Sequence, residues 1–274
     1  MDLAASSLRV EQQRLEAEQA VSNIDALSEL GIHPILESGF FDAGYGVLRE
    51  RPYPGLWMGR PGKRSIVPTL TERERCDLVI TELPSQILRD DPTQRRAGLQ
   101  DDLLAAGTLF SDPAHRIAPV VKKKRTKQAA RLPSGQQPAA PPSLPAPPPS
   151  LPAPLFDLPI SPDDAFWLEV KVIGQFTISR GITCPNRSYA TELVTAVYSD
   201  CFKLASDPVI LRGGLLLILH AQDQRTARHD LDIAIQQAWS RGSSCRTPLV
   251  DGFPLNDRIG NTWATVALIE RPAT

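Results

Sequence analysis

The sequence is poor in the residues that build cross-linked or metal-caged small proteins. It has only four cysteines and four histidines in 274 residues. The cysteines form no Cys-x-x-Cys pair, and the histidines show no metal-binding spacing. This argues against a disulfide framework or a zinc cage, and a reducing compartment is the simplest expectation.

Long hydrophobic runs are also missing. The longest unbroken aliphatic stretch, Leu215 to Leu219, is far shorter than the roughly 20 residues that cross a bilayer. The first residues carry no basic segment followed by an apolar one, and they soon include Glu, Gln and Arg, which a signal peptide does not tolerate. We therefore expect a soluble cytoplasmic protein with no membrane partner.

Positive and negative charges are nearly balanced, with 30 Lys and Arg residues and 31 Asp and Glu residues. This balance neither favours nor excludes nucleic acid as a partner, since a local basic patch is enough to bind phosphates. One such patch is the run Lys122, Lys123, Lys124 and Arg125. It either holds a DNA backbone without sequence preference or keeps a linker solvated.

Hydrophobic periodicity predicts alternating helices and strands. Residues 3 to 30 are typical of a helix that ends at Gly31, and Pro34 suits the first turn of a second helix reaching Ala43. Strands are predicted at 47–51, 76–81, 166–173, 215–220 and 262–269, and further helices at 93–110, 189–205 and 227–241.

A proline-rich segment interrupts this pattern, since nearly half of the 26 prolines lie between Pro133 and Pro162. Such a segment favours extended conformers without hydrogen bonds, so we predict a disordered insertion. The predicted divisions are an N-terminal helix (1–31), a core in two parts (32–82 and 163–274) and the insertion (83–162). With the insertion removed, the element order predicts an α/β fold with a central mixed β-sheet flanked by helices.

Two of the predicted strands carry charges among apolar residues. Strand alternation places Glu169 and Lys171 on one face, and Asp77 interrupts another apolar strand. If these strands are neighbours, Asp77 and Glu169 can bind one divalent cation together with the backbone carbonyl of Val170. Hard oxygen ligands of this kind suit Mg²⁺, or Mn²⁺.

This pattern resembles the PD-(D/E)xK nuclease superfamily, also called restriction-endonuclease-like. The resemblance is carried by Asp77 within CDLVI and by Glu169-Val-Lys171 within WLEVKV; Cys76 stands where the family has a proline. It implies a Mg²⁺-dependent nuclease that hydrolyses phosphodiester bonds in DNA. Asp77 and Glu169 would be metal ligands, and Lys171 would orient the attacking water or help to deprotonate it.

The resemblance covers roughly residues 30–82 and 163–270 and implies a restriction-endonuclease-like core. The family often adds an acidic residue from the first helix or just after it, for which Glu37 and Glu50 are candidates and Glu50 is preferred. Gln175, four residues beyond Lys171, is a candidate contact to the phosphate or to a metal-bound water. A solvated surface residue is the alternative for each of these.

Three other interpretations stay open. The charged strand residues could form a surface ion pair at an exposed edge, as Asp200 and Lys203 are expected to do on their helix. A restriction-endonuclease-like fold could serve as a non-catalytic binding or scaffold protein. The N-terminal helix and the proline-rich segment could dock partners, and the helix has enough apolar positions to form a homodimer with a second copy.

Overall fold

The computed structural model describes residues 1–56, 75–89, 91 and 158–272. The helix expected at 93–110, the basic run from Lys122 to Arg125 and most of the proline-rich segment lie outside the described residues. The described residues form one compact unit, which includes residues 1–31 that the sequence analysis set apart from the core.

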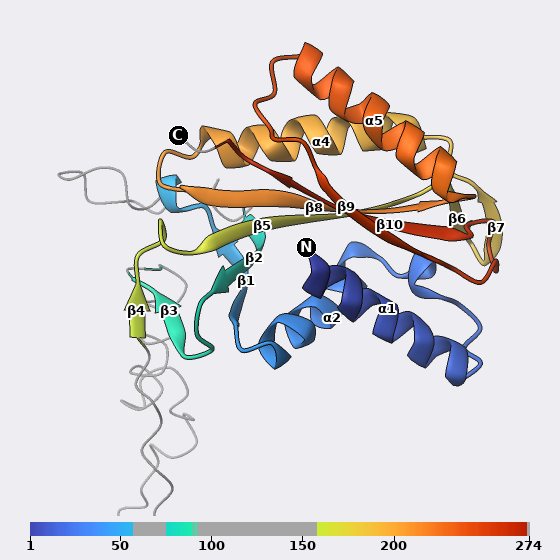
Figure 1. Ribbon diagram of the computed structural model, residues 1–274, viewed down its shortest axis with the longest axis horizontal. Coiled ribbons are helices and arrows are strands. Elements are labelled where there is room, and N and C mark those ends of the chain that lie inside the picture. The colour runs from blue at the N-terminus through green and yellow to red at the C-terminus, as the bar shows by residue number, and fades with distance from the viewer. Residues whose placement is uncertain (57–74, 90, 92–157, 273–274) are drawn as a thin grey trace, which may run out of the picture. The chain divides into compact units, whose positions relative to one another are not determined.

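Six strands form a mixed central sheet (Figure 1). In order across the sheet they are β1 (Gly46–Pro52), β2 (Arg75–Thr81), β5 (Phe166–Gly174), β8 (Arg212–Ala221), β10 (Trp263–Glu270) and β9 (Leu249–Pro254). The β5–β8 pair is parallel, and all other neighbours in this sheet are antiparallel. The prediction of an α/β fold with a mixed sheet is confirmed, and the strands that carry Asp77 and Glu169 are neighbours.

Helices cover both faces of this sheet (Figure 1). On one face lie α4 (Tyr189–Ser206) and α5 (Gln224–Ser240), and on the other α1 (Asp2–Ala17) and α2 (Glu29–Asp42). The strand β8 is buried on both sides, which explains its unbroken aliphatic run. Within the described part of the chain, none of the helices combines the length and the apolar character needed to traverse a membrane.

Several short elements escaped sequence analysis. They are the 3₁₀ turns η1 (Ile24–Ala26) and η2 (Pro54–Leu56), the parallel pair β3 (Gln86–Leu88) and β4 (Leu158–Ile160), and the hairpin β6 (Phe176–Ser179) with β7 (Ile182–Pro185). The edge strand β9 was missed as well. Both β3 and β4 fall inside the interval 83–162 that was expected to be an insertion, so its two ends pair with each other.

The N-terminal prediction was wrong in its boundaries. The helix expected over residues 3–30 ends at Ala17, and a second helix begins at Glu29, so that Gly31 and Pro34 both lie inside α2. The end of α1 is a Schellman arrangement built without glycine. Gln19 takes a left-handed backbone (φ 52°), and the Ala20 N–H donates to the carbonyl oxygen of Leu15 at 2.9 Å.

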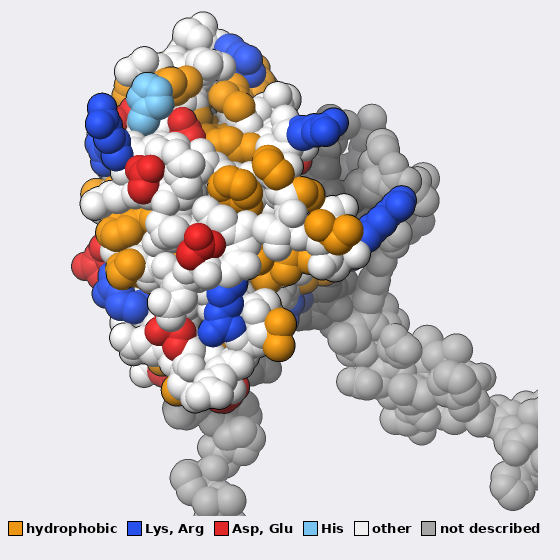
Figure 2. Space-filling model, turned by 90° about the vertical axis from the view of Figure 1, so that its right-hand side faces the viewer, with side chains coloured by type: hydrophobic (Ala, Val, Ile, Leu, Met, Phe, Trp, Pro, Cys, Tyr) orange, Lys and Arg blue, Asp and Glu red, His pale blue; other side chains and the backbone are white. Residues whose placement is uncertain are grey.

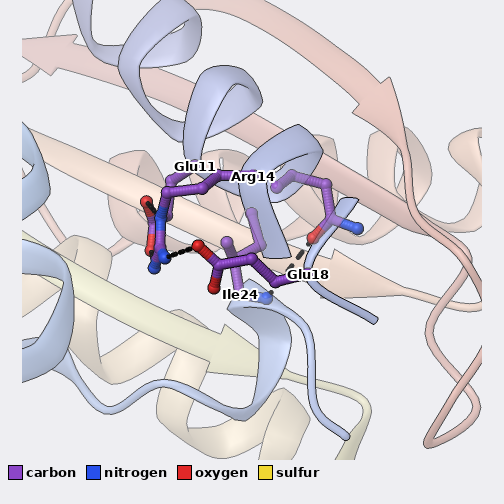
Figure 3. A network of polar contacts seen from close by, with 5 residues as sticks. Glu11, Arg14, Glu18 and Ile24 are labelled. Carbon is purple, nitrogen blue, oxygen red and sulfur yellow. Dashed lines mark hydrogen bonds and ion pairs between the residues drawn. The ribbon is translucent and has the colours of Figure 1, made fainter. Parts of the chain in front are cut away.

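Polar contacts tie α1 to the turn that follows it (Figure 3). The Arg14 guanidinium pairs with Glu11 and Glu18 at 2.6 Å each, on the exposed side of the helix. Gln12 is buried, and its Oε1 accepts a hydrogen bond from the Ile24 N–H at 3.4 Å. Because exposed ion pairs contribute little to stability, the buried amide is the contact that fixes η1 against α1.

The contact between α1 and α2 depends on Gly39. A Cβ at this position would lie 1.8 Å from Ser7 Oγ and 2.7 Å from Ser7 Cβ. We expect Gly39→Ala to lower the free energy of unfolding by about 1 kcal/mol, because overpacking (about 1–3 kcal/mol) outweighs the roughly 1 kcal/mol that Ala gains over Gly in a helix. Urea unfolding of the purified variant measures this.

Gly31→Ala in the same helix is the matched control, since its Cβ would meet only the Leu27 side chain at an ordinary 3.4 Å. This control should be neutral or slightly stabilising. Adding Ser7→Gly to Gly39→Ala should recover part of the loss. Equal stability of the two alanine variants would contradict the proposed close packing.

Candidate active site

The site lies along the β5 edge, at a stretch to which no described strand is paired. β2 pairs with β5 only through residues 78–80, whereas β5 continues along β8 as far as Gly174. Where this pairing ends, the Asp77 side chain replaces a backbone partner. Its Oδ2 accepts a hydrogen bond from the Val170 N–H at 2.8 Å. The Asp77 carboxylate therefore lies against β5 at the residue between Glu169 and Lys171.

The same contact orients the backbone carbonyl of Val170. In a strand, the N–H and C=O of one residue point toward the same neighbour. Because the Val170 N–H faces Asp77, its carbonyl oxygen faces the open edge too. This is the side on which the sequence predicted a third oxygen ligand.

Three side chains at this edge could hold a metal ion. Glu29, His33 and Asp77 each offer one ligand atom, and these atoms lie within 4.8 Å of one another. Glu29 and His33 are one turn apart on α2, so they share a face of the helix. Sequence analysis found no metal-binding spacing among the histidines, and for His33 the structure corrects this.

The state of His33 fits a ligand role. The side chain has no exposed surface, its Nε2 lies 4.0 Å from Asp77 Oδ1, and neither ring nitrogen has a hydrogen-bond partner among the described residues. Buried polar groups are nearly always paired, so an imidazole of this kind calls for an explanation. A cation held by two carboxylates and one imidazole nitrogen would supply a partner for one of these ring nitrogens. The donor set suits Mn²⁺ better than Mg²⁺, because imidazole is a poor ligand for Mg²⁺.

Glu169 lies beside this group but is bonded elsewhere. Its Oε1 accepts a hydrogen bond from the Tyr53 hydroxyl, and the side chain is buried. Burial and then the negative charge of Asp77 raise the pKa of Glu169 to about 8, while the Tyr53 hydrogen bond opposes the shift. At neutral pH and without a cation, Glu169 therefore carries a proton.

Lys171 reaches α2 across the open edge, where its Nζ lies 2.8 Å from Glu29 Oε2. Burial lowers the pKa of Lys171, but the hydrogen bond to Glu29 and the charges of Glu29, Asp200 and Asp77 outweigh it, so that the pKa is raised. Lys171 is therefore an ammonium ion at neutral pH. This argues against proton abstraction by Lys171, one of the two roles expected for it, and leaves the orientation of the attacking water.

Helix α4 adds two residues that sequence analysis placed in a merely local pair. Lys203 Nζ and Asp200 Oδ1 are 2.6 Å apart, as expected. Burial lowers the pKa of Lys203, but Asp200 and the charge of Glu169 raise it overall, whereas Lys171 acts against the rise. The charges of this pair thus interact with Glu169 of β5. Sequence spacing could not show this, because it reports neighbours on one helix and not the facing strand.

The tentative acidic residues lie apart from the metal-binding group. Glu50 has a left-handed backbone (φ 52°) and is skipped in the β1–β2 register, between the pairs Arg49–Leu78 and Arg51–Cys76. Its carbonyl oxygen accepts a hydrogen bond from Arg75. Glu37 is half-exposed, with its Oε2 3.7 Å from Arg49 Nη1. The helix carboxylate that joins Asp77 is Glu29, which corrects the preference for Glu50.

Gln175 is directed toward α5 by its hydrogen bonds. Its Nε2 donates to Asp230 Oδ2 at 3.1 Å, and its Oε1 accepts from the Gln222 N–H at 2.9 Å. Both side-chain atoms are therefore used in links within the fold. The expected contact of Gln175 with a phosphate has no support in this arrangement.

Comparisons with protein-family models, with curated proteins and with solved structures return no match for this chain.

The buried acid Glu169 should make stability depend on pH. Its pKa rises from 4.5 in the unfolded chain to about 8 on folding, so the folded state binds more protons between these values. The free energy of unfolding should fall between pH 5 and 8, by on the order of 3 kcal/mol from this group. Glu169→Gln, which keeps an acceptor for Tyr53, should remove that part of the slope in urea unfolding. Glu270→Gln, which removes the acid of the surface ion pair with Arg246, is the control and should leave this slope unchanged. If the free energy of unfolding of Glu169→Gln depends on pH as that of the wild type does, Glu169 is not the group with the raised pKa.

Mn²⁺ should stabilise the wild-type chain against unfolding, by about 2.7 kcal/mol at 100 times its Kd. His33→Ala and Asp77→Asn should lose most of this gain, because each removes a ligand. The gain is measured within each variant, with and without Mn²⁺, so any general destabilisation cancels. His229→Ala, on the exposed side of α5, should keep it. An equal gain in His33→Ala would exclude this histidine as a ligand.

Proposed function

We propose that this chain is a metal-dependent phosphodiester hydrolase of the restriction-endonuclease-like kind, acting on DNA. The observation that carries the proposal is the Asp77 carboxylate lying against β5 between Glu169 and Lys171, beside Glu29 and His33. The neighbouring positions of β2 and β5 in the sheet also support it, because these strands carry the residues of the resemblance, Asp77, Glu169 and Lys171.

The metal would be held by Asp77, Glu29 and His33, with Glu169 as a further carboxyl beside them. When bound, a divalent cation polarises the phosphodiester and lowers the pKa of a water molecule. For Glu169 to join the ligands as a carboxylate, its proton must leave, whereas Oε1 can keep the hydrogen bond from Tyr53 while Oε2 binds the cation. The Tyr53 contact would then help to orient Glu169 next to the site.

Positive charge at the same edge would act on the phosphate. The ammonium groups of Lys171 and Lys203 interact electrostatically with the acids Asp77 and Glu169, respectively. Fixed cations of this kind stabilise the charge that develops on the oxygens in the transition state. Lys171 is the closer to Asp77 along β5, so we assign this role to it first.

The second candidate is a non-catalytic binding or scaffold protein with the same fold. The observation in its favour is that the charges are already paired within the chain, Lys171 with Glu29 and Lys203 with Asp200. Such a network is also what a purely structural cluster would show. The two candidates differ in whether the bonds of bound DNA are cut.

The proposal predicts cleavage of plasmid or single-stranded DNA in the presence of Mn²⁺ or Mg²⁺. Asp77→Asn and Lys171→Ala should each reduce the rate by about 100-fold or more, because each removes a fixed charge that acts on the reacting phosphate. Glu37→Gln, an exposed acid on α2, is the control and should leave the rate unchanged. Cleavage that survives in both site variants excludes the proposal, and DNA binding without any cleavage favours the scaffold.

A further inference from the structure

A cavity adjoins the candidate active site at the end of β5. Its volume is about 430 Å³, and it lies between the start of α2, the β6–β7 hairpin and the beginning of α4. Ser28 and Val172 line it, and they are the chain neighbours of Glu29 and Lys171. The cavity thus begins beside the Glu29–Lys171 ion pair. Its size is in the range of pockets that bind small organic molecules, about 300–1,000 Å³.

Two buried side chains in its wall have polar atoms without hydrogen-bond partners among the described residues. Asp25 is 8% exposed, and its Oδ1 accepts no hydrogen bond there. His220 has no exposed surface, and neither of its ring nitrogens is bonded. Both residues line the cavity. Because unsatisfied buried groups are costly, they point to a ligand that bonds with both.

The wall is held in place by Asn261, which is fully buried. Its Nδ2 donates to Asp25 Oδ2 and to the Phe176 carbonyl oxygen, at 3.1 Å each, and its Oδ1 accepts from the Phe176 N–H at 3.2 Å. The Phe176 ring packs against Gly260, where a Cβ would lie 2.6 Å from the ring. The carboxylate and the aromatic ring are therefore fixed relative to each other.

The side chains of this wall suit a planar aromatic ligand that carries hydrogen-bond donors and acceptors at its edges. Phe176 offers an aromatic face for stacking, and Asp25 accepts from N–H groups. Burial lowers the pKa of His220 to about 4, so its neutral ring presents one donor and one acceptor. The charged residues of the wall are Asp25 and Glu192, both acidic, which repel a phosphate and attract N–H donors.

The surface around the β6–β7 end of the domain has a pattern of side chains that suits a base linked to a phosphate backbone. Figure 2 faces the end of the domain where β6 and β7 lie, and hydrophobic side chains gather over the middle of this face. Most of its Lys and Arg side chains lie toward the edge (Figure 2). A nucleic-acid strand could therefore place a base inward while its phosphates stay near the basic edge.

We propose that this cavity binds one unpaired nucleobase of the strand whose phosphodiester lies at Asp77. The position of the phosphate rests on the proposed hydrolase function, whereas binding of the base does not require cleavage. The base stacks on Phe176 and donates to Asp25. A duplex would have to open at this nucleotide, which costs a few kcal/mol, so single-stranded or frayed DNA is the preferred substrate class.

The test measures binding of a labelled single-stranded hexanucleotide to the full chain by fluorescence anisotropy, in EDTA so that no cation is present. One nucleotide at a time is replaced by an abasic one. We expect a loss of affinity of about tenfold at one position and little change elsewhere. Phe176→Ala should weaken binding of the intact strand by a similar factor and abolish the abasic effect.

Ser179→Ala, on an exposed position of the same hairpin, is the matched control and should bind like wild type. Phe176→Leu keeps an apolar side chain without an aromatic face and serves if Phe176→Ala does not fold. Asp25→Asn should also weaken binding. The proposal is overturned if abasic strands bind as well as intact ones, or if the abasic effect persists without Phe176.

Binding of Mn²⁺ that Asp25→Asn abolishes would make the cavity a cation site and would also overturn the proposal. The cleavage assay is read separately. Base-dependent binding without cleavage by any form of the chain refutes the hydrolase and keeps the nucleobase site. Cleavage without any effect of abasic positions or of Phe176→Ala keeps the hydrolase and refutes the nucleobase site.

Discussion

The contact between the Asp77 carboxylate and the Val170 amide organises the whole region. It closes the β2–β5 pairing with a side chain instead of a backbone carbonyl, so the rest of the β5 edge stays open. An acidic group is thereby fixed beside a strand that carries Glu169 and Lys171. Because the hydrogen bond comes from a rigid sheet, the position of Asp77 does not depend on loops, which is what a site for chemistry requires.

Around this contact, pairing within the chain lowers the free-energy cost of burying charged groups. Lys171 meets Glu29, and Glu169 meets Tyr53. Burying an isolated charge would be costly, and paired or neutralised groups avoid most of that cost. His33 differs from these groups, because neither of its ring nitrogens is bonded in the part of the chain that the structure describes. This contrast is the reason why we propose a metal ion as the partner of His33.

Sequence alone predicted the central strands well, because β-branched and aliphatic runs around Asp77 and Glu169 show clear strand alternation. It missed β9, an edge strand whose Gly252 and Pro254 are poor strand formers. It also missed the Glu29–His33 pair, for a traceable reason. α1 ends in a left-handed glutamine instead of glycine, so the predicted helix ran past its true end. It took in Glu29 and left His33 in the connection before the second predicted helix.

The parallel pairing of β3 with β4 brings together two parts of the chain that are far apart in the sequence. Asp77 and Glu169 lie 92 positions apart in the chain, yet they are carried by adjacent strands. The short β3–β4 ladder brings the chain leaving one strand next to the chain approaching the other. Insertions or deletions between β3 and β4 would therefore leave the relative positions of Asp77 and Glu169 unchanged.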